Sequence, residues 1–283
     1  NVKKIEKQKK DFIVSTENSK FQSKSLIIAT GGKTYPGTGA SGDGYIFAKD
    51  LGHTITPLYP ALNGLIVKDK NIRDLAGLTL KNVRLQFLAD GQEEINVFGD
   101  LLFTHLGISG TIVLSSSEKV ARLIDKGKEV EAIIDLKPAL ERQRLKKRIV
   151  REMQEIGKKE YQTLLKNLLP SSLIPLTIKK TKIDKRKKVG SLTHEEQTRI
   201  VDFLKNFKFK IDNYEPFVKA IVTSGGVPIN EIDSKTMQSQ IIPNLYFAGE
   251  IIELSGPTGG FNLQMAFSTG WVAGKSARCN LSS

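Results

Sequence analysis

The sequence contains a single cysteine and no long hydrophobic run. Cys279 alone cannot form an internal disulfide, which excludes a disulfide-stabilised secreted domain. No apolar run reaches the roughly 18 residues of a membrane-spanning helix, and no secretory signal pattern is present. These absences predict a cytoplasmic protein without membrane contact.

Residues that bind metals or act as nucleophiles do not occur in their usual groupings. The three histidines are far apart in the sequence, and no cluster of His, Cys and acidic residues has metal-ligand spacing. Neither a G-x-S-x-G motif nor a Ser/His/Asp arrangement appears. The sequence therefore predicts no metal site and no hydrolase of the Ser/His/Asp type.

Negative charge is scarce in one part of the chain. The net charge is +13, and the window 141–190 alone holds sixteen Lys and Arg against five Asp and Glu. Few aromatic side chains interleave these charges for base stacking, so we interpret the window as a solvated helical surface. Nucleic acid is then not the expected partner. The alternative is a nucleic-acid-binding segment over Lys179–Lys188.

The stretch 244–274 has the most informative pattern. It begins with an apolar run, Leu245–Ala248, of the length of a buried strand, and the carboxylate of Glu250 follows. Residues 255–260 are turn-forming, and a helix is predicted from Leu263 onward. Glycines let a backbone approach a ligand closely, and a helix N-terminus favours electron-rich groups. A strand, an acid, a glycine-rich loop and a helix N-terminus together are typical of a cofactor site.

A second glycine-rich segment lies near the start of the sequence. Ser25–Ala29 is a continuous apolar run, as in a strand buried on both faces, and it leads into the bend at 30–32. Glycines continue through Lys33–Gly44, and Tyr45–Leu51 is predicted to form a helix. We expect this bend to pass close to the same cofactor.

Between these two segments the pattern changes twice. Residues 61–136 contain short β-prone segments, several alternating with period two, which indicate an antiparallel sheet or small barrel. Residues 137–210 show helical periodicity, with a capping box at Thr193 and Glu196. We interpret the middle of the chain as a module inserted into a nucleotide-binding domain.

These motifs resemble one family of flavoproteins. The segments ATGGKTYPGTGASGDGY at 29–45 and YFAGE…G-x-T-G-G-F-N-L-Q-x-A-F-x-x-G at 246–270 are similar to those of aminoacetone-oxidase-type enzymes, often labelled NAD(P)/FAD-dependent oxidoreductases. The resemblance covers essentially the whole chain. It implies an α/β fold: a split glutathione-reductase-like FAD-binding domain with an inserted antiparallel β-barrel-like domain and a helical subdomain.

The resemblance also sets the expected domain boundaries. They are 1–58 for the first part of the FAD-binding domain, 59–137 for the β-barrel-like domain, 138–210 for the helical subdomain, 211–227 for the last strands of the β domain and 228–283 for the C-terminal part of the FAD-binding domain.

FAD is the cofactor that the resemblance implies. Glu250 would accept hydrogen bonds from ribityl hydroxyls, and the helix N-terminus would stabilise negative charge on the reduced ring. The residues expected to bind FAD are Thr30, Gly31, Gly32, Gly249, Glu250, Thr258, Gly259, Gly260, Asn262 and Leu263.

His105 is the predicted catalytic residue. It lies in a loop-like motif, Gly99–Gly110, of the inserted module, where it could bind or deprotonate an amine or hydroxyl substrate. A hydrogen-bonded structural histidine is the alternative. Thr104, Ser109 and Tyr35 are expected to contact the substrate.

One motif that the resemblance leads us to expect is absent. A FAD-binding domain of this type begins with a strand, G-x-G-x-x-G, a helix and a later acid, which bind the ADP half of the cofactor. No such run occurs near the start of this sequence. We therefore expect a chain that lacks its N-terminal segment and retains FAD weakly.

The predicted function is FAD-dependent oxidation of a small amine, with hydride transfer to the flavin and reoxidation by oxygen. Three alternatives stay open. They are NAD(P)H-dependent reduction of an unsaturated substrate, a nucleic-acid-binding or RNA-modifying flavoprotein, and an inactive fragment.

Overall fold

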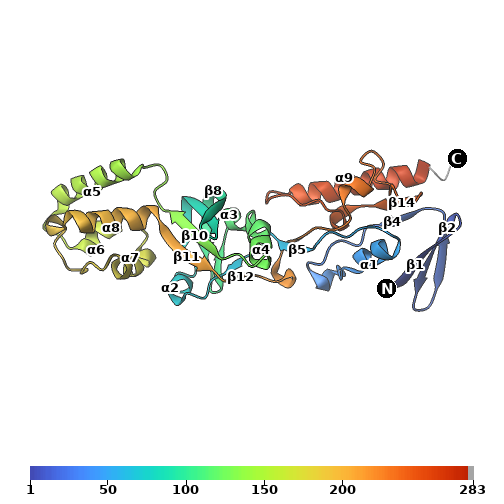
Figure 1. Ribbon diagram of the computed structural model, residues 1–283, viewed down its shortest axis with the longest axis horizontal. Helices are drawn as coiled ribbons and strands as arrows, with labels where there is room; N and C mark the ends of the chain where they lie inside the picture. Colours follow the sequence, from blue (N-terminus) through green and yellow to red (C-terminus); the bar gives the residue numbers. More distant parts are fainter. Residues whose placement is uncertain (280–283) are drawn as a thin grey trace. The chain divides into compact units, whose positions relative to one another are not determined.

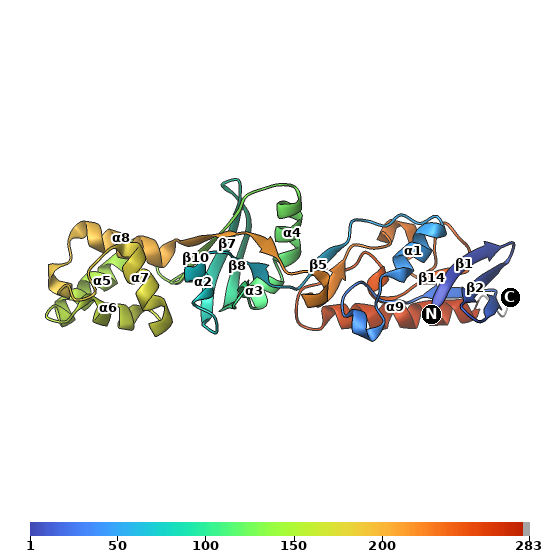
Figure 2. The ribbon, with the colours of Figure 1, turned by 90° about the horizontal axis from the view of Figure 1, so that it is seen from below.

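The computed structural model describes residues 1–279, whose contacts divide them into two compact units. Unit 1 combines residues 1–63 with the segment that begins at Glu215, and unit 2 is residues 64–214. Figures 1 and 2 show the ribbon from two directions. The expectation for Cys279 concerns a side chain outside the described residues.

A parallel pair of strands organises unit 1. Its elements are β4 (Leu26–Ile28), β14 (Leu245–Phe247), α1 (Asp43–Asp50) and α9 (Phe261–Cys279). Successive side chains of a strand point to opposite faces, so the two faces of β14 have different neighbours. Leu245 and Phe247 share a buried cluster with Tyr45 of α1, whereas Tyr246 packs with Ala273 of α9. The strand pair is thus the middle layer between two helices (Figure 1).

Two small antiparallel sheets and several single turns complete unit 1. The other elements are β1 (Val2–Gln8), β2 (Asp11–Thr16), β3 (Lys20–Ser23), β5 (Tyr59–Ala61), β13 (Val222–Ser224) and the 3-10 turns η1 (Pro36–Thr38), η4 (Phe217–Lys219), η5 (Ile229–Glu231) and η6 (Gly249–Ile251). Residues 217–222 form a β-prone run in the sequence, but of these only Val222 belongs to a strand. Pro216 precedes a 3-10 turn there, and only from Val222 does the backbone pair with β5.

Unit 2 contains a seven-stranded antiparallel sheet with the order β11-β10-β7-β8-β9-β6-β12. The strands are β6 (Leu65–Ile66), β7 (Thr79–Ala89), β8 (Gln92–Phe103), β9 (Gly107–Ser109), β10 (Val130–Asp135), β11 (Phe207–Ile211) and β12 (Asn213–Tyr214). This linear pairing shows an antiparallel sheet; closure into a barrel stays a prediction. The motif at 99–110 was expected to be loop-like. Instead, β8 continues through Gly99, whose φ of +152° accompanies a shift in register against β7.

Helices form the rest of unit 2. They are α2 (Lys70–Arg73), α3 (Thr111–Leu114), α4 (Ser117–Asp125), α5 (Arg142–Ile156), α6 (Tyr161–Leu168), α7 (Ile174–Thr181) and α8 (His194–Lys205), with the 3-10 turns η2 (Ser171–Leu173) and η3 (Val189–Ser191). One hydrophobic cluster joins the sheet to α5–α8, with Leu145 and Ile149 of α5 fully buried. The capping box predicted at α8 is present, since the Glu196 N–H bonds the Thr193 hydroxyl at 3.2 Å and the Glu196 carboxylate accepts from the Thr193 N–H.

Candidate functional site

The two glycine-rich segments meet at one edge of the parallel strand pair. Ile28 pairs with Phe247, and the N–H of Ala248 donates to the carbonyl of Ile28 at 3.1 Å. Both strands therefore end side by side, and the bend at 30–32 follows one while Glu250 follows the other. The crevice beyond the carboxyl ends of parallel strands is the usual ligand site of α/β sheets.

Glu250 is held in place by residues distant in the sequence. Its Oε1 atom accepts a hydrogen bond from the N–H of Thr223 at 2.8 Å and from the hydroxyl of Thr34 at 3.2 Å. The hydroxyl of Thr223 accepts in turn from the N–H of Lys33 at 2.7 Å. The carboxylate thus joins the bend to β13 and has a fixed orientation before any ligand arrives.

Gly32 lies directly against this carboxylate. A Cβ atom built at position 32 would lie 2.1 Å from Oε1 of Glu250 and 2.4 Å from the Thr223 hydroxyl oxygen. Such distances are far below a van der Waals contact, so only glycine fits without moving the carboxylate. Its neighbours Thr30 and Gly31 contact other residues, because Thr30 packs on Gly44 and Gly31 on Ala40.

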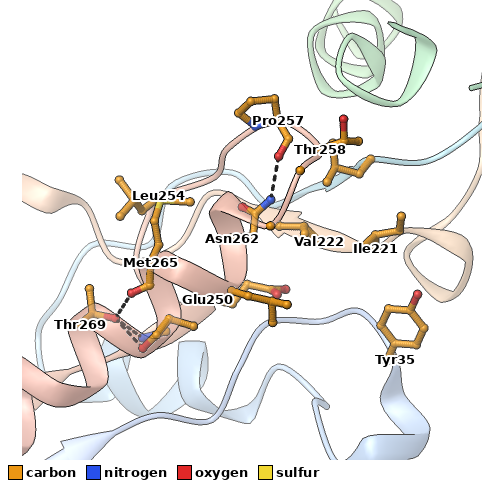
Figure 3. Close-up of a pocket in the computed structure, with 16 residues that line it drawn as sticks. Tyr35, Ile221, Val222, Glu250, Leu254, Pro257, Thr258, Asn262, Met265 and Thr269 are labelled. Atoms are coloured by element: carbon orange, nitrogen blue, oxygen red, sulfur yellow. Dashed lines mark hydrogen bonds between the residues drawn. The ribbon is translucent and has the colours of Figure 1, made fainter. Parts of the chain in front are cut away.

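The glycine-rich loop before α9 is fixed by the side chain of Asn262. Its Oδ1 atom accepts from the N–H of Gly256 at 2.8 Å, and its Nδ2 atom donates to the carbonyl of Gly256 at 2.9 Å. The same Nδ2 atom is 3.5 Å from the carbonyl of Pro257 (Figure 3). The loop then passes through two glycines with positive φ, Gly259 at +108° and Gly260 at +87°. Asn262 therefore shapes the loop with both of its polar atoms.

Thr269 fixes the opposite wall. Its hydroxyl accepts from the N–H of Gly249 at 3.0 Å and donates to the carbonyl of Met265 at 2.7 Å, which ties α9 to the turn that carries Glu250 (Figure 3). The loop, the turn and α9 together enclose a pocket of about 460 Å³ in unit 1. This volume is within the range of small-ligand and cofactor sites.

Most of the residues predicted to bind a cofactor line this pocket. They are Gly249, Glu250, Thr258, Gly259, Gly260, Asn262 and Leu263, joined by Tyr35 from the predicted substrate residues. Of the remaining three, Gly32 lies behind Glu250, while Thr30 and Gly31 are absent from the lining. The wall contributed by α9 and its loop is thus close to what the motif suggests, while the bend itself only supports Glu250 through Gly32, and Tyr35 of the following segment joins the lining.

Sequence reasoning missed the apolar half of the pocket. The additional lining residues are Leu62, Ile221, Val222, Leu254, Pro257, Met265, Ala266 and Thr269. Leu62 and Ile221 come from the two segments that link to the inserted module, and no local pattern marks them. Helical spacing could have predicted Met265, Ala266 and Thr269, because they lie one and two turns after the loop on the same helix.

Tyr35 has an unusual backbone. Its φ and ψ angles of 51° and 55° are left-handed, a region that few residues other than glycine adopt. Its side chain is 54% exposed although it lines the pocket. Strained backbone conformations cluster at ligand sites, so this angle marks Tyr35 as a functional candidate.

Tyr45 of α1 contacts the turn that carries Glu250. Its hydroxyl donates to the backbone carbonyl of Glu250 at 3.2 Å. Burial, together with the nearby Glu250 charge, raises the pKa of Tyr45 well above its ordinary value. The phenol therefore stays protonated and remains a hydrogen-bond donor across the physiological range.

His105, Thr104 and Ser109 belong to unit 2. His105 is exposed in the turn between β8 and β9, and the Thr104 hydroxyl accepts from the N–H of Gly107 at 3.1 Å to close that turn. Ser109 lies in β9 opposite Leu102. The catalytic role of His105 and the substrate roles of the other two stay predictions.

A Ser–His–Glu chain that the sequence does not reveal lies in the core of unit 1. The ring nitrogens of His53 are 2.7 Å from a Glu231 carboxylate oxygen and 2.8 Å from the Ser239 hydroxyl. The same hydroxyl accepts from the N–H groups of Ile241 and Ile242. Because His53 has no exposed side-chain surface, this chain stabilises the core and offers no nucleophile to a substrate.

Burial alone would raise the pKa of Glu231, but the hydrogen bonds from Thr54 and His53 outweigh this effect, and its pKa lies below the usual value.

Among residues 1–279 no group of His, Cys, Asp and Glu could hold a metal ion. In the same range no helix has the length and apolar character to cross a bilayer.

The family model for the HI0933-like protein Rossmann domain matches residues 1–276. The chain therefore belongs to the HI0933-like Rossmann domain family, which agrees with the α/β arrangement around β4 and β14.

Three curated proteins illustrate the range of the relatives. The chain is 29% identical over 268 residues to a 3-dehydro-bile acid delta(4,6)-reductase of Clostridium scindens, covering 95% of this chain and 65% of the relative. It is 32% identical to a ribosomal RNA dihydrouridine synthase of Haemophilus influenzae (94% and 63% covered) and 28% identical to one of Escherichia coli (95% and 64%). The chain thus spans somewhat less than two thirds of the length of each. None of these three names refers to aminoacetone, so that narrower resemblance stays a prediction.

Proposed function

We propose that this protein is a flavin-dependent reductase of a carbon–carbon double bond conjugated to a carbonyl group, with FAD as the cofactor and NAD(P)H as the source of electrons. The observation that carries the proposal is the pocket of about 460 Å³ between the glycine-rich loop, Glu250 and α9. Among the alternatives named above, this is the reduction of an unsaturated substrate.

The residues of the pocket fit the ring half of FAD. A flat, largely apolar ring system needs apolar walls, which Leu254, Leu263 and Met265 provide. It also needs close backbone approach, and at Gly260 a Cβ atom would meet nothing within 4 Å. Glu250, held by Thr223 and Thr34, is placed to accept hydroxyl hydrogen bonds from the ribityl chain. The bound flavin would supply hydride transfer.

The names of the relatives support reduction over oxidation. A delta(4,6)-reductase of a 3-dehydro-bile acid acts on double bonds near a ring carbonyl. Dihydrouridine differs from uridine by two hydrogens across the C5–C6 double bond, which is conjugated to the C4 carbonyl. Both reactions add one hydride and one proton to the same type of bond. Amine oxidation, the activity first expected from the sequence, has no counterpart among these names.

Tyr35 is the proton donor in this proposal. Of the side chains lining the pocket in the described part of the chain, Tyr35 and Glu250 are ionisable, and Glu250 is engaged by Thr223 and Thr34. The exposed Tyr35 phenol can deliver a proton to the carbon next to the carbonyl and regain one from water.

The reaction is tested with the purified chain, FAD and NADPH under anaerobic conditions. We expect NADPH consumption to rise with 2-cyclohexenone or uridine and the saturated product to appear, and Tyr35→Phe to lower kcat at least about tenfold, as loss of a general acid does. Oxygen-dependent aminoacetone consumption without enone reduction would instead support the amine oxidase. Neither activity, in a protein that binds flavin, would overturn the reductase proposal.

Flavin binding is tested separately with Gly32→Ala. The added methyl must push Glu250 off the N–H of Thr223, so the Kd for riboflavin, measured by quenching of its fluorescence, is expected to rise at least about tenfold, the loss of one charge-assisted hydrogen bond. Riboflavin is used because it carries the ring and ribityl chain alone. Gly37→Ala is the matched control, since a Cβ there meets nothing within 4 Å. Equal Kd values for both variants would show that the pocket is not the flavin site.

A further inference from the structure

Helix α5 has a strongly basic outer side. A groove of about 630 Å³ in unit 2 is lined by four cations, Arg144, Lys147, Arg148 and Arg151, against one carboxylate, Glu152. Seven residues separate the first cation from the last, which is a rise of roughly 10 Å along the helix. The buried side of the same helix packs Leu145 and Ile149 into the core, so the orientation of the cations is fixed by packing.

The cations of this groove are poorly neutralised. Arg148 is 3.7 Å from Glu152, whose other oxygen accepts from Asn167, so the only acid of the groove is already engaged. Within residues 1–279, the side chains of Arg144, Lys147 and Arg151 make no ion pair or hydrogen bond. Burial and the charge of Arg148 lower the pKa of nearby Lys137, consistent with a local excess of positive charge.

This arrangement is unfavourable for an isolated helix. The like-charged neighbours stand at spacings of three and four, at which equal charges destabilise a helix; they are Arg144, Lys147, Arg148 and Arg151. Helix α8 is different, since its Arg199 pairs with Glu195 one turn away at 3.2 Å. A row of unpaired cations that repel each other becomes favourable once an anion with regularly spaced charges lies across it.

In the basic segment that the sequence singled out, Lys179–Lys188, two side chains have polar partners. Lys187 bonds the Glu196 carboxylate at 2.8 Å, and Lys179 donates to Asn71 at 2.7 Å. The α5 cations differ from this segment because four of them line one groove on a single packed helix, so we examine α5 as the anion-binding surface.

We propose that the α5 groove binds the phosphate backbone of a folded RNA that carries the uracil to be reduced. This inference rests on the proposed function and selects, among conjugated double bonds, the uracil C5–C6 bond. Phosphate contacts from Arg and Lys position a nucleic acid without reading its sequence. The groove lining holds no aromatic side chain on which unpaired bases could stack, which favours paired, folded RNA over a single strand.

The test compares two triple variants of the full chain for binding to unmodified ribosomal RNA transcripts. The groove variant changes Arg144, Lys147 and Arg151 to Gln, which keeps helix propensity high. The control variant makes the same charge change at the exposed Lys81, Lys126 and Lys208 of the sheet region. We expect the groove variant to bind at least about tenfold more weakly at ~0.15 M salt and to lower the slope of log K against log salt by about 2–3, one lost phosphate contact per cation. The control variant is expected to retain wild-type affinity.

Equal weakening in both variants would mean a general charge effect and would overturn the proposal. Unchanged RNA binding in the groove variant would also overturn the proposal. The same holds if the chain binds phosphatidylserine vesicles tightly but does not bind RNA at ~0.15 M salt. RNA binding requires no flavin, and 2-cyclohexenone reduction requires no RNA. A chain that reduces the enone but fails to bind RNA therefore disproves the groove and leaves the reductase standing. RNA binding through the groove without enone reduction disproves the reductase and the uracil assignment, and leaves only the phosphate-binding role of the groove.

Discussion

Replacement of Gly226 by alanine is expected to destabilise unit 1 by about 3 kcal/mol or more and to abolish flavin binding. Gly226 has a φ of +133°, and a Cβ atom there would lie 2.3 Å from the carbonyl oxygen of Ile251 and 3.2 Å from the ring of Tyr45. That carbonyl belongs to the turn of Glu250 and accepts from the N–H of Val227 at 2.9 Å. The backbone cannot move away without breaking the hydrogen bond that joins Val227 to the turn of Glu250.

Hydrogen exchange measured by mass spectrometry in increasing urea gives this free energy for each unit separately. Gly52→Ala is the matched control, because Gly52 also has a positive φ, +91°, but a Cβ there meets nothing within 4 Å. The control should lose only about 1 kcal/mol from backbone strain. Unit 2 should be unchanged in both variants. If Gly226→Ala is no worse than Gly52→Ala, close packing of this backbone against the Glu250 turn is not important for stability.

The second large effect is expected in unit 2, where Lys205→Met should lower the free energy of unfolding by about 3 kcal/mol. Lys205 ends α8 and bonds the Asp135 carboxylate at 2.5 Å and the carbonyls of Lys137 and Leu140 at 3.2 and 2.7 Å. The two charged side chains are only 13% and 14% exposed. One ammonium group thus ties the end of β10 and the linker to α5 onto α8, and its loss leaves a mostly buried carboxylate without a counter-ion.

Two companion variants separate the charge from the packing. Lys210→Met removes an ion pair with Glu129 whose side chains are 54% and 78% exposed, and it should leave the urea midpoint of unit 2 unchanged. Lys205→Met combined with Asp135→Asn removes the orphaned charge and should recover at least about half of the loss. A double variant as unstable as Lys205→Met would show that side-chain packing, rather than the unpaired carboxylate, causes the effect.

The parts of this fold that depend on local pattern could be predicted from the sequence. The apolar spacing of Leu145 and Ile149, the capping box at Thr193 and the glycine-rich loop before α9 all depend on residues a few positions apart. Short-range failures came from backbone effects that patterns do not encode. Ser115 and Ser116 separate α3 from α4, and Gly99 lets β8 continue into a motif that was expected to be loop-like.

The supports of the site could not be predicted, because they join distant residues. Thr223 lies 190 residues from Lys33 and 27 from Glu250, yet it bonds both. The two glycines that follow Thr223 indicate a turn, but they do not indicate which groups its hydroxyl and N–H bond. Likewise, the groove on α5 depends on which cations find an acid, which only the packed helices decide. The sequence can therefore indicate a ligand-binding loop and a basic window. It cannot indicate the hydrogen bonds that hold Glu250 behind the loop, or which cations of the basic window stay unpaired.

The split composition of unit 1 has a consequence for its biogenesis. Strand β4 leaves the ribosome early, but its partner β14 is made only after all of unit 2 has been translated. Domains tend to fold as they emerge, so unit 2 can fold while the first 63 residues still lack the C-terminal part of unit 1. Interrupted translation would then yield chains with a finished α5 and no pocket, and such products would compete for an α5 ligand without performing any redox chemistry.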